Sequence, residues 1–435
     1  MSLGALLRMW RRRALLTQEQ LAERAGLNVR TVRRLENDGL LQPRTTSVLA
    51  LAKALELDGA ERATLNAVAR GHPTDRPTTA PADPSVTGPR PWTIPRQLPA
   101  DVAAPGVRER ELAIVEDHAT MPELNEVVVF VNGMAGMGKT VLAVHAAHRL
   151  APRFPDGQLF VDLHGHAQAT APVEPGAALA RILRTMGVPA KHIPWHPDDR
   201  AALYRSVLAG RRLLIVLDDA ADEHQLQPLL PATPGCQVIV TSRHRLTCPG
   251  DVRILSLDTL PLAEAITLFT RTAGCDRDTP PDVLAEIVRR CGLLPLAIRI
   301  AAACLQAHPA WNAHHLLDRL AADRLTELTA GRQSVTAAFD RSYERLPTDQ
   351  QEAYRLLGSA LHPAFDLDTA TALLNTTTTQ AIRLLDHLLN AHLLQEPAPG
   401  LYRLHDLIHA HASALWPPDG VRASLQVRCH TALLT

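Results

Sequence analysis

A glycine-rich run that contains one lysine and one threonine follows a strand-like stretch of apolar residues near position 130. The run reads G-x-x-x-x-G-K-T over 133–140, directly after the apolar stretch 127–131. Glycines at its first, fourth and sixth positions let the backbone turn amide groups toward phosphate oxygens. The helix expected next adds the positive end of its dipole. The sequence therefore predicts a nucleoside-triphosphate site, lined by Gly133, Met134, Ala135, Gly136, Met137, Gly138, Lys139, Thr140 and Val141.

The lysine and the threonine of this run have separate expected roles. Lys139 is expected to reach the β- and γ-phosphates, and Thr140 to hold Mg²⁺. The chain has only two other lysines, Lys53 and Lys191, since arginine carries nearly all its positive charge. A lysine at this position of the motif therefore supports the prediction of a phosphate-binding loop.

Two further strand-like stretches end in residues that suit the same site. The apolar stretch 213–217 ends in Asp218 and Asp219. At the carboxyl edge of a parallel sheet, Asp218 is expected to bind Mg²⁺ directly or through water, and Asp219 to orient an attacking water. The stretch 237–241 is followed by Arg243, which we expect to sense the charge of the γ-phosphate.

A second group of residues predicts DNA binding near the N-terminus. Thr17 and Gln20 form a capping box that opens a helix over 18–25, and Gly26 permits a sharp turn. Asn28 then caps a second helix that ends at Glu36. Two short helices joined by a tight turn predict a helix-turn-helix.

The second helix is expected to present Arg30, Thr31, Arg33 and Arg34 to a DNA duplex. Arginine suits phosphate contacts, and in the major groove it can bind guanine through two hydrogen bonds. Only Glu19 and Glu23 oppose the arginines that precede Leu35, which are Arg8, Arg11, Arg12, Arg13, Arg24, Arg30, Arg33 and Arg34. The alternative is a solvated arginine face on a small helical bundle.

The elements around these residues predict a multidomain protein. Strand candidates at 127–131, 158–163, 212–218, 236–241 and 253–257 alternate with helical patterns, which indicates an α/β doubly wound parallel sheet. Helical patterns follow to about Ala322, and a hairpin is expected with its turn at 397–400. We expect an all-α helix-turn-helix domain (1–71), a Pro-rich linker (72–105) whose stretch after Trp92 docks on the next domain, a P-loop nucleotide-binding domain (106–260), a helical domain (261–330) and a winged-helix domain (331–435).

Composition limits the remaining classes of protein. The 45 basic and 45 acidic residues balance, so attraction to nucleic acid must be local. The six cysteines form no C-x-x-C pair, which fits free thiols in a reducing cytoplasm. Neither a secretory signal nor a membrane span is expected.

The N-terminal motif resembles the XRE-type helix-turn-helix over the whole run 16–36. From about Gln97 to Ala412 the chain resembles an NB-ARC module of the STAND class of P-loop NTPases, and most of all bacterial regulators of the AfsR-like type. The landmarks of this second resemblance are the phosphate loop, Leu217-Asp218-Asp219, Thr241-Ser242-Arg243, Cys291-Gly292-Leu293-Leu294-Pro295-Leu296 and Leu404-His405-Asp406.

These resemblances imply further roles. Pro295 is expected to pack against adenine, and His405, from a winged helix, to touch the β-phosphate of ADP and lock a closed state. Arg108 is expected beside the nucleotide, although its stretch lacks the usual Phe-x-Gly-Arg form. Leu293 replaces a small residue of the family's C-G-G-L-P-L pattern. Gln18 is expected on a DNA phosphate, and near the bases Asn28, Arg30, Thr31 and Arg33.

The leading hypothesis is a cytoplasmic transcriptional regulator in which exchange of ADP for ATP opens the molecule. Open protomers are expected to form a homo-oligomer that presents several DNA-binding heads, and any ATP hydrolysis is expected to be slow, as a timer. One alternative is a STAND signalling or defence ATPase whose N-terminal module binds protein. Another is a metabolic P-loop enzyme such as a kinase. A metal site at His405, His409 and His411 is a minor alternative to the nucleotide role of His405.

Overall fold

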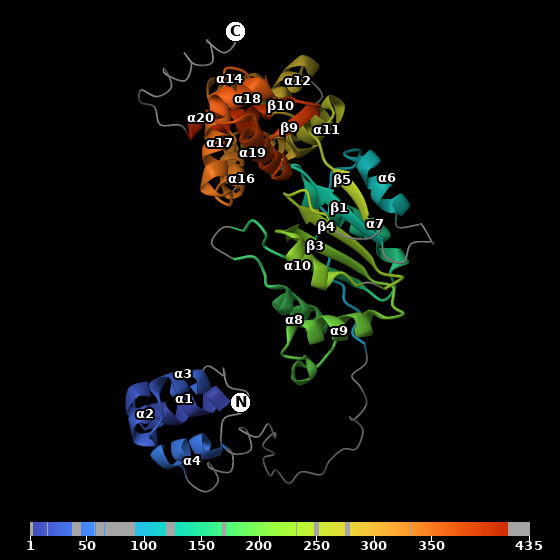
Figure 1. The fold of residues 1–435 in the computed structure, drawn as a ribbon. Coiled ribbons are helices and arrows are strands. Elements are labelled where there is room, and N and C mark those ends of the chain that lie inside the picture. The colour runs from blue at the N-terminus through green and yellow to red at the C-terminus, as the bar shows by residue number, and fades with distance from the viewer. Residues whose placement is uncertain are drawn as a thin grey trace. The chain divides into compact units, whose positions relative to one another are not determined.

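The computed structural model of this protein separates into two compact units, 1–88 and 89–435, each with its own core (Figure 1). The structure describes residues 3–14, 16–36, 45–55, 57, 65, 92–118, 127–167, 171–231, 233–247, 252–274, 279–331 and 333–415. Residues 72–91 of the predicted linker lie outside this part. The finer domain boundaries stay a prediction.

The first unit is a helical bundle built around the predicted motif. Its described helices are α1 (Leu3–Arg13), α2 (Gln18–Ala25), α3 (Val29–Glu36) and α4 (Thr45–Ala54). The capping box is confirmed: Thr17 Oγ1 accepts from the Gln20 backbone N–H at 3.2 Å, and the Gln20 side chain accepts from the Thr17 N–H at 2.9 Å. Gly26 ends α2 with a left-handed φ of 64°. Leu21 and Val32 face the core, so the predicted helix-turn-helix is confirmed.

A buried ion pair joins the first and third helices of this unit. Arg11 donates to the two carboxylate oxygens of Glu36 at 2.6 and 3.0 Å, and the Gln18 amide donates to the same carboxylate at 2.7 Å. Glu36 is fully buried. The prediction that Arg11 belongs to the exposed positive face is therefore wrong, because an acid beyond Leu35 holds its guanidinium. The same carboxylate engages Gln18, which was expected on a DNA phosphate.

Glu36→Gln is expected to destabilise this unit by about 3 kcal/mol, because it leaves a buried guanidinium without its counter-charge. Although burial raises the pKa of Glu36, hydrogen bonds from Arg11 and Gln18 outweigh it and lower that pKa below its ordinary value. A carboxyl with a lowered folded-state pKa stabilises the fold above its unfolded pKa, and this contribution is lost as pH falls through the folded pKa. Hydrogen exchange of α1–α3 in the full chain measures both effects. Glu23→Gln, at an exposed site on α2, is the control, and an equal effect there would refute the role of Glu36.

The second unit begins with a five-stranded parallel sheet in the order β2-β3-β4-β1-β5 (Figure 1). The strands lie where the sequence predicted them, within two residues: β1 (Val127–Asn132), β2 (Gln158–Asp162), β3 (Leu214–Ala220), β4 (Gln237–Ser242) and β5 (Val252–Ser256). The chain moves outward from β1 to β2, returns through β3 and β4, and then crosses to β5. Ligands bind at such a reversal, beyond the carboxyl ends of the strands.

Alternate residues of the central strand face two different helical layers. Val129 and Val131 share a core with α6 and α7, whereas Val128 and Phe130 share one with α8 and α9. Both faces of the sheet are therefore covered, which explains why its strands are continuous apolar runs. The helices of this region are α6 (Glu109–His118), α7 (Lys139–Leu150), α8 (Pro175–Thr185), α9 (Pro197–Leu208) and α10 (Glu223–Leu226).

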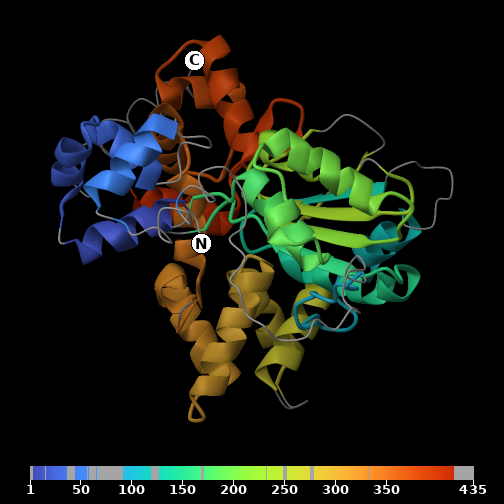
Figure 2. The same ribbon diagram turned by 90° about the horizontal axis from the view of Figure 1, so that it is seen from below.

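Helices dominate the chain after the sheet and form a separate group beside it, yellow to red in Figure 2. The first set is α11 (Leu262–Ala273), α12 (Pro281–Arg290), α13 (Pro295–Ala307), α14 (Ala313–Ala322) and α15 (Arg324–Glu327). A two-stranded sheet, β6 (Thr329–Ala330) with β7 (Gln333–Ser334), leads to the second set: α16 (Val335–Tyr343), α17 (Thr348–Gly358), α18 (Leu367–Leu374), α19 (Thr378–Asn390) and α20 (Asp406–Ala414).

A three-stranded antiparallel sheet accompanies the last helices, in the order β8-β10-β9. Its strands are β8 (Ala364–Asp366), β9 (Gln395–Ala398) and β10 (Leu401–Arg403). The predicted hairpin is present, but β9 continues through Pro397, so the turn is only Pro399-Gly400. Gly400 supplies its left-handed φ of 75°. Helices with a small antiparallel hairpin match the predicted winged helix.

The segment from Trp92 to Ala104 packs on the second unit. The Trp92 indole donates to the Asp156 carbonyl at 3.3 Å, and the Arg211 guanidinium lies 3.6 Å from its ring centroid. Gln158 exchanges backbone hydrogen bonds with Pro95 and Gln97, which places this segment beside β2. The predicted docking after Trp92 is confirmed.

Candidate nucleotide site and DNA-facing helix

A cavity of about 530 Å³ opens at the carboxyl ends of the strands, where the glycine-rich run meets β3 and β4. Polar and charged side chains from seven elements and their loops converge on it. Its lining includes the predicted residues Ala135, Gly136, Gly138, Lys139, Thr140, Val141, Asp218, Asp219, Arg243 and Pro295. It also includes residues for which the sequence predicted no such role, namely Val102, Asp162, Thr241, Leu296, Arg299, Gln333 and Arg341.

The loop before α7 has the backbone that its glycines allow. Gly133, Gly136 and Gly138 all have positive φ, of 146°, 85° and 84°. Lys139 folds back over the loop, and its Nζ donates to the Gly133 and Met134 carbonyls at 2.7 and 2.9 Å. Burial, with Arg243 nearby, lowers the pKa of Lys139 to about 7. Two backbone carbonyls of the loop thus hold the Lys139 ammonium.

Two hydroxyls and one carboxylate form an oxygen cluster beside this lysine. Asp218 Oδ1 accepts from Thr140 Oγ1 at 2.8 Å and from Thr241 Oγ1 at 2.6 Å. Burial raises the pKa of Asp218, which the two hydroxyl hydrogen bonds partly offset. Mg²⁺ prefers oxygen ligands such as carboxylates and hydroxyls, so Asp218 and Thr140 fit this ion.

The second acid of the pair is held differently. Asp219 has a left-handed φ of 52°, and its carboxylate accepts from the His166 backbone N–H at 2.7 Å and from His166 Nδ1 at 3.1 Å. Burial lowers the pKa of His166 to about 4, so the ring is neutral and donates from Nδ1. Burial also raises the pKa of Asp219, but His166 and Arg243 outweigh that and bring it to about 2. Asp219 therefore stays ionised in the cavity wall.

Arg243 connects the cavity to the C-terminal helices. Its Nη1 donates to the Ala338 carbonyl at 2.9 Å and to Ser342 Oγ at 3.0 Å, both on α16. Its Nε lies 3.8 Å from Asp219. Arg243, which we expect to sense a γ-phosphate, therefore lines the cavity while its guanidinium is hydrogen-bonded to α16.

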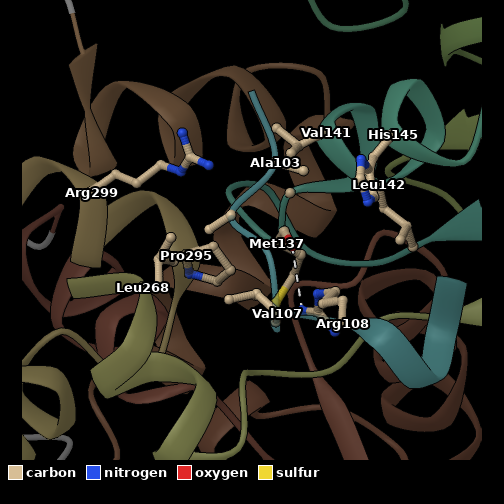
Figure 3. A pocket seen from close by; sticks show the side chains of 12 residues that line it. Ala103, Val107, Arg108, Met137, Val141, Leu142, His145, Leu268, Pro295 and Arg299 are labelled. Carbon is tan, nitrogen blue, oxygen red and sulfur yellow. Dashed lines mark hydrogen bonds between the residues drawn. The ribbon is translucent and has the colours of Figure 1, made fainter. Parts of the chain in front are cut away.

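A smaller, mostly apolar pocket adjoins this cavity (Figure 3). Pro295, Leu268, Val107 and Met137 give it apolar walls, and it shares Pro295 and Arg299 with the larger cavity. Pro295 and Arg108, both expected near the nucleotide, therefore lie at one pocket. An apolar pocket beside a phosphate loop suits a flat heteroaromatic base.

The Arg108 guanidinium braces this pocket. It donates to the Met137 carbonyl at 3.3 Å, drawn in Figure 3, and to the Asp258 carbonyl and the Glu111 carboxylate. Its backbone N–H donates to Glu264 at 2.8 Å. Since these donors already have acceptors in the protein, Arg108 shapes the pocket wall.

The end of the predicted linker forms another wall of the site. Val102 lines the larger cavity and Ala103 lines the smaller pocket. Hydrogen bonds to α7 and to α13 hold this segment in place. Asp101 accepts from His145 of α7 at 2.7 Å, and the Val102 carbonyl accepts from Arg299 of α13 at 2.9 Å. A run of small residues gave no sequence signal for this role.

His405 lies in a different cavity from the phosphate loop, and its expected contact with ADP stays a prediction. It does not line the phosphate cavity; its Nε2 donates to the Gly292 carbonyl at 2.9 Å, in a separate cavity of about 480 Å³ that also contains Arg403. At this contact Gly292 and Leu293 both take left-handed conformations, with φ of 62° and 54°. His409 and His411 bond two other acceptors, so the three rings serve separate contacts.

The helix that the sequence predicts to face DNA is α3. Arg30, Arg33 and Arg34 are exposed and Thr31 is half-buried. Asn28 caps the helix through a hydrogen bond from the Arg30 N–H at 2.8 Å, and Arg33 pairs with Glu19 at 2.8 Å. Exposed ion pairs of this kind contribute little, so Arg33 can exchange this partner for a phosphate or a base.

The fold and the site define two domain families. Residues 108–275 match the family model of the NB-ARC domain, and residues 2–65 match that of a helix-turn-helix domain. The chain therefore carries an NB-ARC P-loop module preceded by a helix-turn-helix domain. In the described part of the chain, no helix has the length and apolar character needed to cross a membrane.

Two curated relatives are similar in sequence to this chain over most of its length. The regulatory protein AfsR of Streptomyces griseus is 43% identical over 326 residues, and that of Streptomyces coelicolor is 43% identical over 329 residues. Each alignment covers 74% of this chain but 33% of the relative, so the chain spans about a third of their length. A solved STAND protein with a tetratricopeptide repeat sensor from Pyrococcus horikoshii is 17% identical, covering 80% of this chain and 47% of that one, with a TM-score of 0.35.

Proposed function

We propose that this chain is a DNA-binding transcriptional regulator whose NB-ARC module binds ADP and ATP as a switch. The observation that carries the proposal is a pair of adjoining cavities at the end of β1. One is polar and surrounds the phosphate loop, and the other is an apolar pocket lined by Pro295. Together they match the two ends of an adenine nucleotide. The similarity to AfsR regulatory proteins supports the regulatory role.

Different residues of the site are expected to bind the phosphates, Mg²⁺ and water. The amide groups of 133–138 surround the phosphates, and Lys139 exchanges its carbonyl partners for phosphate oxygens. Thr140 and Asp218 together hold Mg²⁺, which neutralises phosphate charge when bound. Asp219, kept ionised and oriented by His166, positions water for slow hydrolysis.

The contact between Arg243 and α16 supplies the switch. While Arg243 donates to Ala338 and Ser342, the C-terminal helices are held against the P-loop region. A third phosphate competes for this guanidinium, because a charged acceptor binds it more strongly than a carbonyl or a hydroxyl does. Nearly inverting a two-state equilibrium requires about 5 kcal/mol of differential binding, to which Arg243 and Mg²⁺ both contribute.

Open protomers then assemble, and the assembly presents several helix-turn-helix units to DNA. Several helix-turn-helix units in one oligomer raise their effective concentration on neighbouring half-sites. Arg30, Arg33 and Arg34 would make the phosphate and base contacts of each unit.

DNA affinity in the two nucleotide states tests the proposal. We expect about 10-fold tighter binding to duplex DNA, selected from a random-sequence pool, with a non-hydrolysable ATP analogue than with ADP. Fluorescence anisotropy at fixed salt measures this difference. Equal DNA affinity with both nucleotides, despite nucleotide binding, would contradict the switch.

A further inference from the structure

Three exposed arginines lie at the amino-terminal edge of the five-stranded sheet, opposite the edge that holds the phosphate cavity. Arg96 pairs with Gln158 at the start of β2, and Arg153 ends a short 3-10 helix just before that strand. Arg212 lies two residues before β3, the neighbour of β2 in the sheet. Since β2 spans five residues, about 15 Å separate these positions from the carboxyl edge, so the nucleotide site does not account for them.

Backbone hydrogen bonds hold the turn that carries these arginines, and the acid of the turn takes part in them. Asp156 Oδ2 accepts from the Arg212 backbone N–H at 2.7 Å, and the Asp156 N–H donates to the Arg212 carbonyl at 3.3 Å. Among the described residues, none accepts a hydrogen bond from the guanidinium of Arg96, Arg153 or Arg212. The side-chain donors of all three arginines therefore face solvent.

A fourth arginine has a different task, because it anchors the segment that leads to the first unit. The Arg211 Nε donates to the Val207 carbonyl near the end of α9 at 2.7 Å, and its guanidinium stacks on the Trp92 ring. The Trp92 indole also donates to the Asp156 carbonyl, in the turn that carries the three exposed arginines. The chain runs in sequence from this anchor to the helix-turn-helix unit. DNA held by α3 therefore stays within reach of the connecting chain, which raises its effective concentration at this edge.

The charge of this edge favours a partner with many phosphates. The whole chain is balanced, with 45 basic and 45 acidic residues, so three arginines without a bonded acid form a local positive excess. A guanidinium binds a phosphate through two parallel hydrogen bonds. The three arginines come from three separate segments, and the backbone of a DNA duplex offers a separate phosphate to each of them.

We propose that Arg96, Arg153 and Arg212 form a second DNA-binding surface, the edge patch, which contacts backbone phosphates of the duplex that α3 binds. This inference rests on the proposed DNA binding. Contacts to phosphates add affinity and fix orientation, but they do not read the base sequence. DNA bound at both places connects the two units of the chain, so the nucleotide-binding unit itself takes part in holding the duplex.

Replacing the edge patch in the full chain tests the proposal. A triple variant with Arg96→Gln, Arg153→Gln and Arg212→Gln is expected to bind duplex DNA about 10-fold more weakly at about 0.1 M salt. The loss should be equal for selected and random-sequence duplexes, because phosphates carry no sequence information. The slope of log affinity against log salt should decrease in magnitude by about 0.9 for each lost contact. Fluorescence anisotropy over a series of salt concentrations measures all three quantities.

The matched control removes three exposed arginines from other elements of the same unit. It carries Arg253→Gln on β5, Arg271→Gln on α11 and Arg383→Gln on α19. Its DNA affinity should stay within about twofold of that of the natural chain, because distant exposed charges are largely screened at this salt concentration. Hydrogen exchange of the natural chain gives a readout without any substitution: duplex DNA should slow exchange at 153–158 and 212–214.

The remaining outcomes separate the edge patch from the proposed function. If the triple variant binds DNA as tightly as the natural chain while Arg33→Gln does not, the edge patch is refuted and the role of α3 stands. Equal losses in the triple variant and its control would mean that net charge alone acts, which also refutes the edge patch. If the triple variant loses ADP affinity as well, its fold is damaged, and absence of DNA protection at 153–158 in the natural chain is then the refuting result. If the natural chain binds no DNA even at low salt, the inference fails together with the proposed function.

Discussion

Lys139→Ala is expected to weaken ADP binding more than about 100-fold, which corresponds to about 3 kcal/mol. The Nζ of Lys139 is buried in the loop, where only the Gly133 and Met134 carbonyls accept from it among the described residues. Phosphate oxygens are stronger acceptors than these carbonyls, so the contact with this ammonium should contribute much of the free energy of ADP binding. Calorimetric titration with ADP measures the loss.

The effect of pH provides an independent signature of the same group. Because burial lowers the pKa of Lys139 to about 7, the ammonium loses its proton as pH rises through that value. A bound phosphate favours the charged form, so the complex binds more protons than the free protein above pH 7. ADP affinity should therefore fall as pH rises above 7, by at most about tenfold per pH unit. Lys139→Ala should abolish this fall.

Lys191→Ala is the matched control, since it removes an exposed lysine from the same region of the chain. It should leave both the affinity and its pH dependence unchanged. Unchanged ADP affinity in Lys139→Ala would contradict the assignment of the phosphate loop.

The sheet and the two motifs could be predicted because their signals are local. Buried parallel strands are continuous apolar runs, and the glycine pattern fixes the loop between β1 and α7. The capping box at Thr17 and the glycine at 26 specify a helix end and a turn by themselves. Short-range backbone preferences thus sufficed for the fold of these parts.

The partners of individual side chains could not be predicted, because they depend on tertiary contacts. Arg11 looked like one more exposed arginine until Glu36, far along the sequence, was found to bind it. Arg243 lines the cavity, but its hydrogen bonds go to α16, a helix about a hundred residues later in the chain.

His405 illustrates a different limit. Its motif predicted a contact with ADP, which stays a prediction, whereas the structure places its Nε2 on the Gly292 carbonyl. Leu293, the residue after that carbonyl, takes a left-handed φ of 54°, a conformation that is uncommon for leucine. Sequence patterns identify residue types at a site, but the backbone between them decides which groups meet.

Arg33→Gln is expected to lower affinity for duplex DNA about 10-fold or more while leaving ADP affinity unchanged. Arg33 is exposed on α3, and its pairing with Glu19 at 2.8 Å is solvent-exposed and easily exchanged. If Arg33 contacts a phosphate, the slope of log affinity against log salt should also decrease in magnitude by about 0.9. A base contact would instead relax sequence preference with little change in the slope.

Arg24→Gln is the matched control for this change. It removes the same charge from the same unit, at an exposed position in the last turn of α2, outside the predicted recognition helix. Equal losses in both variants would mean that net charge alone draws the unit to DNA, and that α3 is not the recognition helix. If the natural chain binds no DNA even at low salt, the exposed arginines of α3 must serve another partner, and a STAND signalling ATPase with a protein-binding N-terminal unit becomes the better account.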